Sequence, residues 1–170
     1  ALDPVDRLAS PLTGELCDGY ANKEEGVLHI LESVEKAGGT NASVWLLDGG
    51  LHSIQDTRSE PLRAAAANWQ ALATWAAGLE NNEDSLLVDI GSTTTDIIRL
   101  RENEVRCSGR SDTERLRAGE LVYTGVRRTP VCAILEEADL NGVASPLAAE
   151  HFATTLDTWL LLDEISEAPA

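Results

Sequence analysis

The sequence predicts an α/β fold, a mixed sheet flanked by helices, in a single domain over residues 1–170. Three observations lead to this prediction. Residues 22–38 and 59–78 carry apolar side chains at helical spacing. Residues 85–100 form two apolar runs around a polar turn, which is typical of two neighbouring strands. The apolar content of 43% is enough for the core of one domain.

The first half of the chain predicts a strand, a helix and a hairpin. A short apolar run indicates a strand over Val5–Leu12. Asn22 followed by Glu25 is a capping-box pattern that begins a helix, and Gly38-Gly39 ends it. Residues 44–47 and 51–54 predict paired strands around a glycine-containing turn.

The second half predicts one long helix, a central sheet and a last helix. The long helix begins at Ser59-Glu60-Pro61 and ends at Gly78. The remaining elements, in order, are strands at 85–90, 96–100 and 105–107, a helical turn at 111–117, a polar loop at 119–130, a buried strand at 131–135, and a helix beginning at Ser145-Pro146.

Charge and cysteine content exclude several classes of protein. A net charge of −16 argues against binding to nucleic acid or an anionic membrane. Cys17, Cys107 and Cys132 lack metal-ligand spacing, so we expect reduced thiols. No signal peptide or membrane-length apolar run is present, and we expect a cytoplasmic protein.

The turn between the two central strands has the composition of a phosphate-binding loop. Gly91 allows close approach of the backbone to a ligand, and the amides of Ser92, Thr93, Thr94 and Thr95 can point at an anion. Asp89 and Asp96 flank the turn and can hold Mg²⁺ through their oxygens. The alternative is a plain hairpin turn with polar tips.

A second group of candidate residues follows the central sheet. Arg115, Arg127 and Arg128 can bind phosphate or carboxylate groups, or can be surface arginines paired with acids. Glu120 and Tyr123 can act as base and hydrogen-bond donor, or can be an ordinary loop carboxylate and a half-buried aromatic.

The Asp89–Asp96 pattern is similar to the phosphate loop of the ribonuclease-H-like fold found in actin, sugar kinases and Hsp70 ATPases. Proteins of that fold carry two such loops, one per lobe, and this chain has one. We therefore expect the chain to lack a complete first lobe. It would correspond to the second lobe and part of the interlobe region of a longer two-lobed protein.

Several blocks of sequence resemble the hydantoinase/oxoprolinase-related family linked to tetrahydromethanopterin-dependent C1 transfer. The resemblance runs from about Asp6 to Leu162. The blocks that carry it are Thr13–Asp18, Glu25–Val27, Ala66–Ala73, Val88–Asp96 and Gly119–Ala133.

This resemblance implies a transferase in methanofuran biosynthesis. The enzyme would join a furan-methyl diphosphate to the phenol of γ-glutamyltyramine and release pyrophosphate. Mg²⁺ near Asp89 and Asp96 would neutralise the diphosphate, an arginine such as Arg115 would take up developing charge, and Glu120 would accept the phenol proton.

Two other functions remain open at the level of sequence. One is an ATP-binding hydrolase or kinase of the actin-like fold, with ATP as ligand. The other is a noncatalytic ligand-binding or assembly domain. In either case we expect a small phosphate or diphosphate ligand, and either a homodimer or a missing lobe supplied by another chain.

Overall fold

The computed structural model describes residues 6–17, 19–38, 41–79 and 84–166. The chain divides into two compact units. Unit 1 contains the residues up to Ser85 together with Arg99–Arg106, and unit 2 contains Leu86–Ile98 and the residues from Cys107 onward. The mixed α/β architecture with flanking helices is confirmed, whereas the ribonuclease-H-like assignment and the single domain stay predictions.

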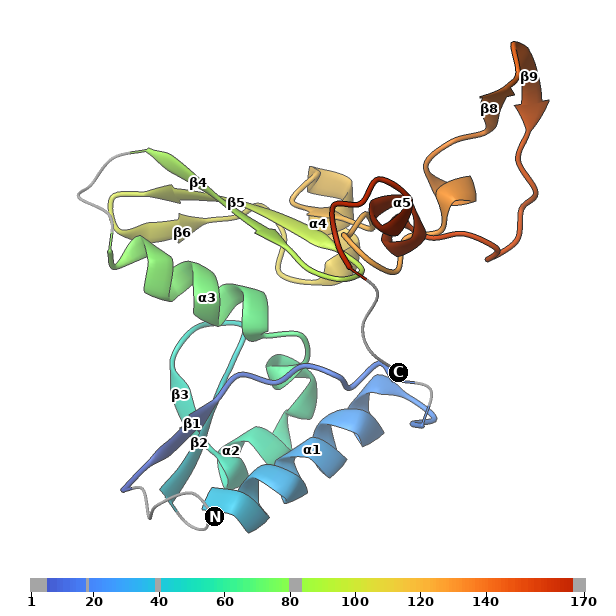
Figure 1. The fold of residues 1–170 in the computed structure, drawn as a ribbon. Helices are drawn as coiled ribbons and strands as arrows, with labels where there is room; N and C mark the ends of the chain where they lie inside the picture. The colour runs from blue at the N-terminus through green and yellow to red at the C-terminus, as the bar shows by residue number, and fades with distance from the viewer. Residues whose placement is uncertain (1–5, 18, 39–40, 80–83, 167–170) are drawn as a thin grey trace. The chain divides into compact units, whose positions relative to one another are not determined.

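The sheet of unit 1 has three strands (Figure 1). Strand β1 (Leu8–Ser10) pairs in parallel with β2 (Ala42–Trp45), and β2 pairs antiparallel with β3 (Leu51–Ser53). The β2–β3 turn contains Gly49 and Gly50, whose φ angles of 89° and 92° favour glycine. The predicted hairpin is therefore confirmed.

Helix α1 (Lys23–Gly38) begins at the predicted cap. The Asn22 side chain accepts a hydrogen bond from the Glu25 amide at 2.9 Å, and the Glu25 carboxylate accepts one from the Ala21 amide at 2.9 Å. These bonds satisfy amides that the first turn leaves without helical partners. Three positions named in the sequence predictions, Val5, Asp18 and Gly39, lie outside the described residues.

The prediction of one long helix from Ser59 to Gly78 is wrong. The structure has a short helix α2 (Ile54–Ser59), a 3₁₀ helix η2 (Pro61–Ala64) and a separate helix α3 (Asn68–Ala77). Ala66 lies between η2 and α3 with φ 51°, a left-handed conformation that interrupts a helix. Alanine-rich sequence at helical spacing does not reveal such a break.

The apolar core of unit 1 lies between its sheet and helices. Alternating side chains of β2 and one face of α1 meet there, with α2 and η2 completing the cluster. Its buried members are Leu12, Val27, Leu31, Ala42, Val44, Leu46, Ile54, Ala64 and Ala65.

The central strands form a second sheet. Strands β4 (Ser85–Ile90), β5 (Thr95–Arg101) and β6 (Glu104–Arg106) lie in that order, and β7 (Leu121–Val122) pairs antiparallel with β5. The predicted strand–turn–strand and the third strand are confirmed. Strand β7 falls inside the region predicted to be a polar loop, which is a correction to that prediction.

Helix α4 (Asp112–Ala118) confirms the helical turn predicted at 111–117. Ser111 and Glu114 form a capping box, and Gly119 ends the helix with φ 71°. Hydrogen bonds from the backbone amides of Ser111 and Arg110 lower the pKa of Glu114 below its ordinary value.

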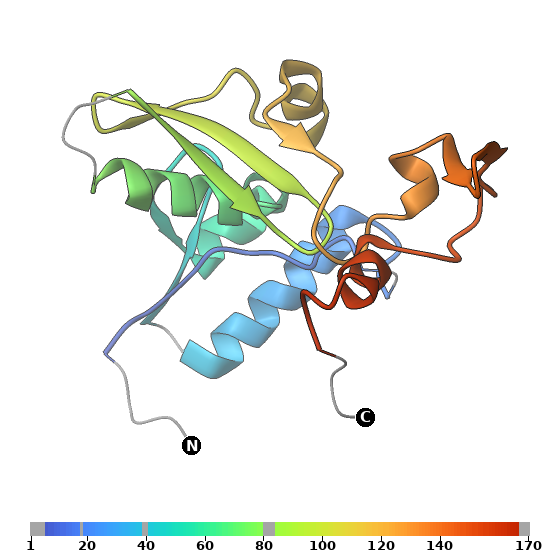
Figure 2. The same ribbon diagram turned by 45° about the horizontal axis from the view of Figure 1, so that its top comes forward.

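Two predictions for the last third of the chain are wrong. Residues 131–135 contain a 3₁₀ helix, η3 (Val131–Ala133), instead of a buried strand. The last helix does not begin at Ser145-Pro146 as predicted, because β8 (Glu137–Leu140) and β9 (Val143–Pro146) form an antiparallel hairpin there, visible in Figure 2. The last described helix is α5 (Thr155–Leu161).

No helix within the described ranges is long and apolar enough to cross a membrane.

Candidate phosphate-binding site

The predicted phosphate loop, residues 91–95, lies against a second loop of unit 2, residues 124–129. Three backbone hydrogen bonds join the two loops. The Val126 amide donates to the Gly91 carbonyl at 3.0 Å, and the amides of Arg127 and Arg128 donate to the Ser92 carbonyl at 3.1 and 2.8 Å. The structure therefore brings Arg127 and Arg128 beside the predicted loop.

Gly125 makes this close contact possible. A Cβ atom at this position would lie 2.5 Å from the Thr93 nitrogen and 2.6 Å from the Gly91 oxygen, both backbone atoms. Residue 125 must therefore be glycine for the two loops to keep this spacing.

Two threonine hydroxyls hold Gly125 in place. The buried Thr129 hydroxyl accepts a hydrogen bond from the Gly125 amide at 2.7 Å. The Thr155 hydroxyl donates to the Gly125 carbonyl at 2.9 Å. None of these three residues was predicted to be part of the site, although Gly125 and Thr129 lie in one of the blocks of family resemblance.

The turn itself is closed by short local bonds. The Gly91 amide donates to the Thr94 carbonyl at 2.8 Å, and the Thr95 hydroxyl donates to the Thr124 carbonyl at 2.6 Å. Within the described ranges, no carbonyl or side chain accepts a hydrogen bond from the amides of Ser92, Thr93 or Thr94. Successive amides of this kind are suited to binding an anion.

The side chains of Arg127 and Arg128 are exposed. Among the residues that the structure describes, no carboxylate lies within ion-pair distance of either guanidinium group. Their charge is therefore available to an anionic ligand next to the Ser92 carbonyl. This outcome differs from the surface ion pairs that were the alternative for these arginines.

Asp96 forms a buried ion pair with Arg115. The Arg115 Nη1 atom lies 2.8 Å from Asp96 Oδ1, and the side chains are 1% and 13% exposed. Burial raises the pKa of Asp96 above its ordinary value, and repulsion by Asp89 adds to this effect, while Arg115 opposes it. Burial outweighs the ion pair because the carboxylate loses most of its hydration.

Glu120 is hydrogen-bonded through both carboxylate oxygens. Oε1 accepts from the Ser108 amide and Oε2 accepts from the Gly109 amide at 3.1 Å. Its carbonyl oxygen accepts from Arg115 Nη2 at 3.0 Å. The predicted base thus anchors the segment before α4, and Tyr123, its predicted companion, is exposed.

Asp89 and Asp96 are the residues to consider for Mg²⁺. In the described part of the chain, no group of three or more His, Cys, Asp or Glu side chains converges on a possible metal position. Mg²⁺ commonly uses one or two carboxylates with waters and substrate phosphates, so two aspartates fit this ion. Because Arg115 engages Asp96 Oδ1, the second oxygen of Asp96 and the carboxylate of Asp89 would be its ligands.

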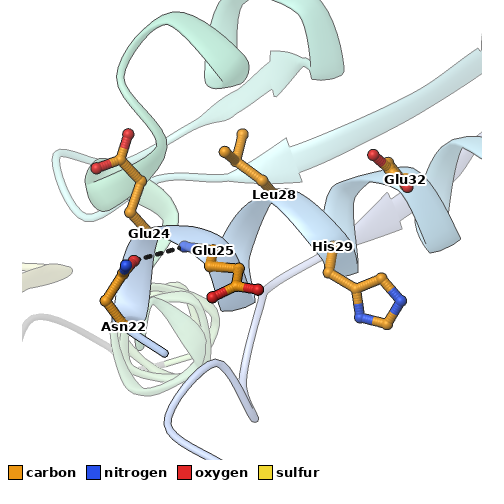
Figure 3. A pocket seen from close by; sticks show the side chains of 6 residues that line it. All are labelled: Asn22, Glu24, Glu25, Leu28, His29 and Glu32. Carbon is orange, nitrogen blue, oxygen red and sulfur yellow. Dashed lines mark hydrogen bonds between the residues drawn. The ribbon is translucent and has the colours of Figure 1, made fainter. Parts of the chain in front are cut away.

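A pocket of about 370 Å³ lies in unit 1 along the first turns of α1 (Figure 3). Glu24, Glu25, Glu32 and His29 contribute to its lining, and the Tyr20 hydroxyl is 2.7 Å from His29 Nδ1. None of the predicted site residues lines it. Its acidic lining would repel a phosphate group. The two loops of unit 2, residues 91–95 and 124–129, are therefore the better candidate for a phosphate-binding site.

The sequence of this chain matches one known protein family along most of its length. The hydantoinase/oxoprolinase family model matches residues 7–169. The chain belongs to the hydantoinase/oxoprolinase family, as the sequence resemblance predicted.

Two relatives share one descriptive name, (4-{4-[2-(gamma-L-glutamylamino)ethyl]phenoxymethyl}furan-2-yl)methanamine synthase. The protein from Methanocaldococcus jannaschii is 39% identical over 166 residues, which cover 97% of this chain and 49% of that protein. The protein from Methanococcus vannielii is 38% identical over 86 residues, 51% of this chain and 38% of that protein. This chain spans about half the length of the Methanocaldococcus jannaschii relative.

Proposed function

We propose that this chain forms part of a transferase of methanofuran biosynthesis that makes an aryl ether by displacing diphosphate from a furan-methyl carbon. One observation carries the proposal. The chain is 39% identical, along 97% of its length, to a relative whose name describes such an ether, a phenoxymethyl group on an aminomethylfuran.

The proposed reaction forms one bond and breaks one. The phenol oxygen of γ-glutamyltyramine bonds to the methylene carbon of the furan-methyl diphosphate. The bond between that carbon and the diphosphate oxygen breaks, its electron pair leaves with pyrophosphate, and the phenol proton passes to a base. A site for this reaction has to stabilise the charge that develops on the leaving group.

The loop pair of unit 2 supplies groups of the right kind for the leaving diphosphate. The amides of Ser92, Thr93 and Thr94 donate hydrogen bonds to its oxygens, and Arg127 and Arg128 add positive charge beside them. This assignment is supported by the backbone bonds that hold the two arginines next to Ser92. Asp89 and Asp96 would hold Mg²⁺, which would supply positive charge to offset the negative charge of the diphosphate.

From the sequence, Arg115 was expected to take up the charge that develops on the leaving group, but its buried position gives it a different role. Because its side chain is 1% exposed and paired with Asp96, it orients that carboxylate and does not touch the ligand. Arg115 is therefore a positioning residue in this proposal.

Glu120 keeps the role of base in this proposal. Each of its carboxylate oxygens accepts one amide hydrogen bond, from Ser108 or Gly109. A carboxylate oxygen has a second lone pair, so the phenol proton can be accepted while both amide bonds remain.

Isothermal titration calorimetry tests the proposal. The chain is titrated with pyrophosphate, with a furan-methyl diphosphate and with ATP, each with Mg²⁺. We expect heat from the first two ligands and weaker binding after Asp89→Asn. Tight binding of ATP without response to the others would favour an ATP hydrolase or kinase, and no response to any ligand would favour an assembly domain. Unchanged affinity in Asp89→Asn would contradict the metal role.

A further inference from the structure

The first turn of helix α5 is bonded to the arginine-bearing loop of the candidate site, residues 124–129. The Thr155 amide donates to the Thr129 carbonyl at 2.9 Å, and the Leu156 amide donates to the Arg127 carbonyl at 3.3 Å. Amides at the start of a helix have no partner within the helix, so they can bind other parts of the chain. Here they hold the arginine-bearing loop against α5.

The main chain of Arg127 is held from two sides. Its amide donates to the Ser92 carbonyl of the predicted phosphate loop at 3.1 Å, and its carbonyl accepts from the Leu156 amide of α5 at 3.3 Å. A shift of Arg127 away from either neighbour breaks one of these bonds. Helix α5, the arginine-bearing loop and the predicted phosphate loop are therefore joined by a continuous series of hydrogen bonds.

Thr155 binds the arginine-bearing loop through both its backbone and its side chain. Its hydroxyl donates to the Gly125 carbonyl at 2.9 Å, while its amide donates to the Thr129 carbonyl. Gly125 is the residue that lies closest to the backbone of the phosphate loop, so the Thr155 hydroxyl bears directly on that contact. The Thr155 side chain is half-buried, and its one hydroxyl proton is used in this bond. Thr155 is therefore placed to hold the loop and not to donate to a ligand.

The spacing of the two loops decides how well their groups act together. The amides suited to an anion belong to the phosphate loop, whereas the guanidinium groups of Arg127 and Arg128 belong to the arginine-bearing loop. Donors that are fixed before a ligand arrives bind it more tightly, because no free energy is spent on ordering them. A bond that holds one loop against the other therefore raises the affinity for an anion without contacting it.

We propose that Thr155 is a positioning residue for the diphosphate group of the substrate. Through the Gly125 carbonyl it fixes the arginine-bearing loop against the phosphate loop, so that the amides of one loop and the guanidinium groups of the other bind the same diphosphate. The inference rests on the proposed function, because it takes a diphosphate as the ligand of the two loops. Thr155 acts through Gly125 and does not touch the diphosphate.

Three variants of the full chain separate the hydroxyl of Thr155 from its bulk. Thr155→Val keeps the branched shape and removes the hydroxyl, whereas Thr155→Ser keeps the hydroxyl and removes the methyl group. Thr158→Val is the matched control on the same helix. The Thr158 side chain is exposed, and its hydroxyl donates to the Thr154 carbonyl at the start of α5, at 3.4 Å, instead of to the arginine-bearing loop.

Two measurements follow the loops. Hydrogen exchange without ligand reports the amides of Val126, Arg127 and Arg128, with the amides of strand β2 in unit 1 as internal reference. Calorimetry with pyrophosphate and Mg²⁺ reports the affinity. Because one hydrogen bond is lost, we expect Thr155→Val to speed exchange of the three amides about tenfold and to weaken pyrophosphate binding about tenfold, with β2 unchanged. Thr155→Ser and Thr158→Val should behave like wild type in both measurements.

Several results would overturn the proposal. They are exchange of the three amides in Thr155→Val at the wild-type rate, an affinity in Thr155→Val equal to that of a wild type that binds pyrophosphate, an equal effect of Thr158→Val, and failure of Thr155→Ser to restore both properties. Exchange accelerated equally at β2 would overturn it as well, since the loss would then not be specific to the loop. If wild type itself does not bind pyrophosphate, the proposed function fails, while the exchange measurement still decides whether Thr155 holds the loop.

Discussion

Arg115 and Asp96 form a buried ion pair that links helix α4 to strand β5, with 2.8 Å between Nη1 and Oδ1. Arg115 also donates a hydrogen bond to the Glu120 carbonyl at 3.0 Å. One arginine therefore connects two residues of the candidate site from inside unit 2. This arrangement fixes the direction of the Asp96 carboxylate before any ligand binds.

Arg115→Met should destabilise the protein markedly. The substitution leaves the Asp96 carboxylate buried without its cation, and breaking a buried pair in this way costs about 3 kcal/mol. Urea denaturation measures the loss. Arg117→Met, an exposed position on the same helix, is the control and should change stability by less than about 0.5 kcal/mol. Equal midpoints for the two variants would contradict a structural ion pair.

Asp96 should make stability depend on pH in a defined direction. Its pKa is raised in the folded protein from the ordinary 3.8, so at a pH between the unfolded and the folded pKa the folded state keeps a proton that the unfolded state loses. This contribution is fully present below the unfolded pKa and is lost as the pH rises through the folded pKa.

The measurement compares the free energy of unfolding of wild type and Asp96→Asn from about pH 3.5 to about pH 7. We expect wild type to lose stability relative to the variant as the pH rises. A difference that is flat, or that has the opposite slope, would contradict the raised pKa.

The sequence predicted those elements whose signals are local. The Asn22–Glu25 cap and the Gly49-Gly50 turn depend on neighbouring residues, and both are confirmed. The break at Ala66 was missed because alanine carries no signal for a left-handed conformation. The hairpin β8–β9 was missed although Asn141-Gly142, both with positive φ, is a strong turn signal for it.

Gly125→Ala should push apart the two loops of the candidate site. The added methyl group would lie within 2.6 Å of the backbone of Gly91 and Thr93, and neither atom can move without its neighbours. We expect a loss of about 1–3 kcal/mol in stability and weaker pyrophosphate binding, measured by thermal unfolding and calorimetry.

Gly19→Ala is the matched control, because a Cβ atom there has no neighbour within 4 Å. If both variants bound pyrophosphate like wild type, the contact between the loops would not shape the site.

Glu120→Gln separates the two roles of this residue. A glutamine accepts hydrogen bonds through one oxygen, so it can keep one of the amides of Ser108 and Gly109. We expect a loss of about 1–3 kcal/mol in stability if the carboxylate is an anchor. If it is also the base, ether formation falls by about 10²-fold or more at a temperature where the variant is folded. Unchanged stability would contradict the anchoring role.

The candidate site was predictable in its residue types but only partly in its arrangement. Asp89, Asp96 and the turn between them follow from the strand pattern, because the flanking strands set their spacing. The position of Arg127 and Arg128 beside Ser92 depends on backbone bonds between distant loops, which composition does not encode. The burial of Arg115 likewise follows from tertiary packing.

The most direct test of the account is the product formed from a furan-methyl diphosphate and γ-glutamyltyramine with Mg²⁺. The protein that contains this chain is assayed, with the complete Methanocaldococcus jannaschii relative as positive control. Mass spectrometry and a pyrophosphate assay follow the reaction. We predict the aryl ether and pyrophosphate in equal amounts, both reduced in Asp96→Asn. Hydrolysis of ATP without formation of the ether, under conditions where the complete relative makes it, would contradict the account.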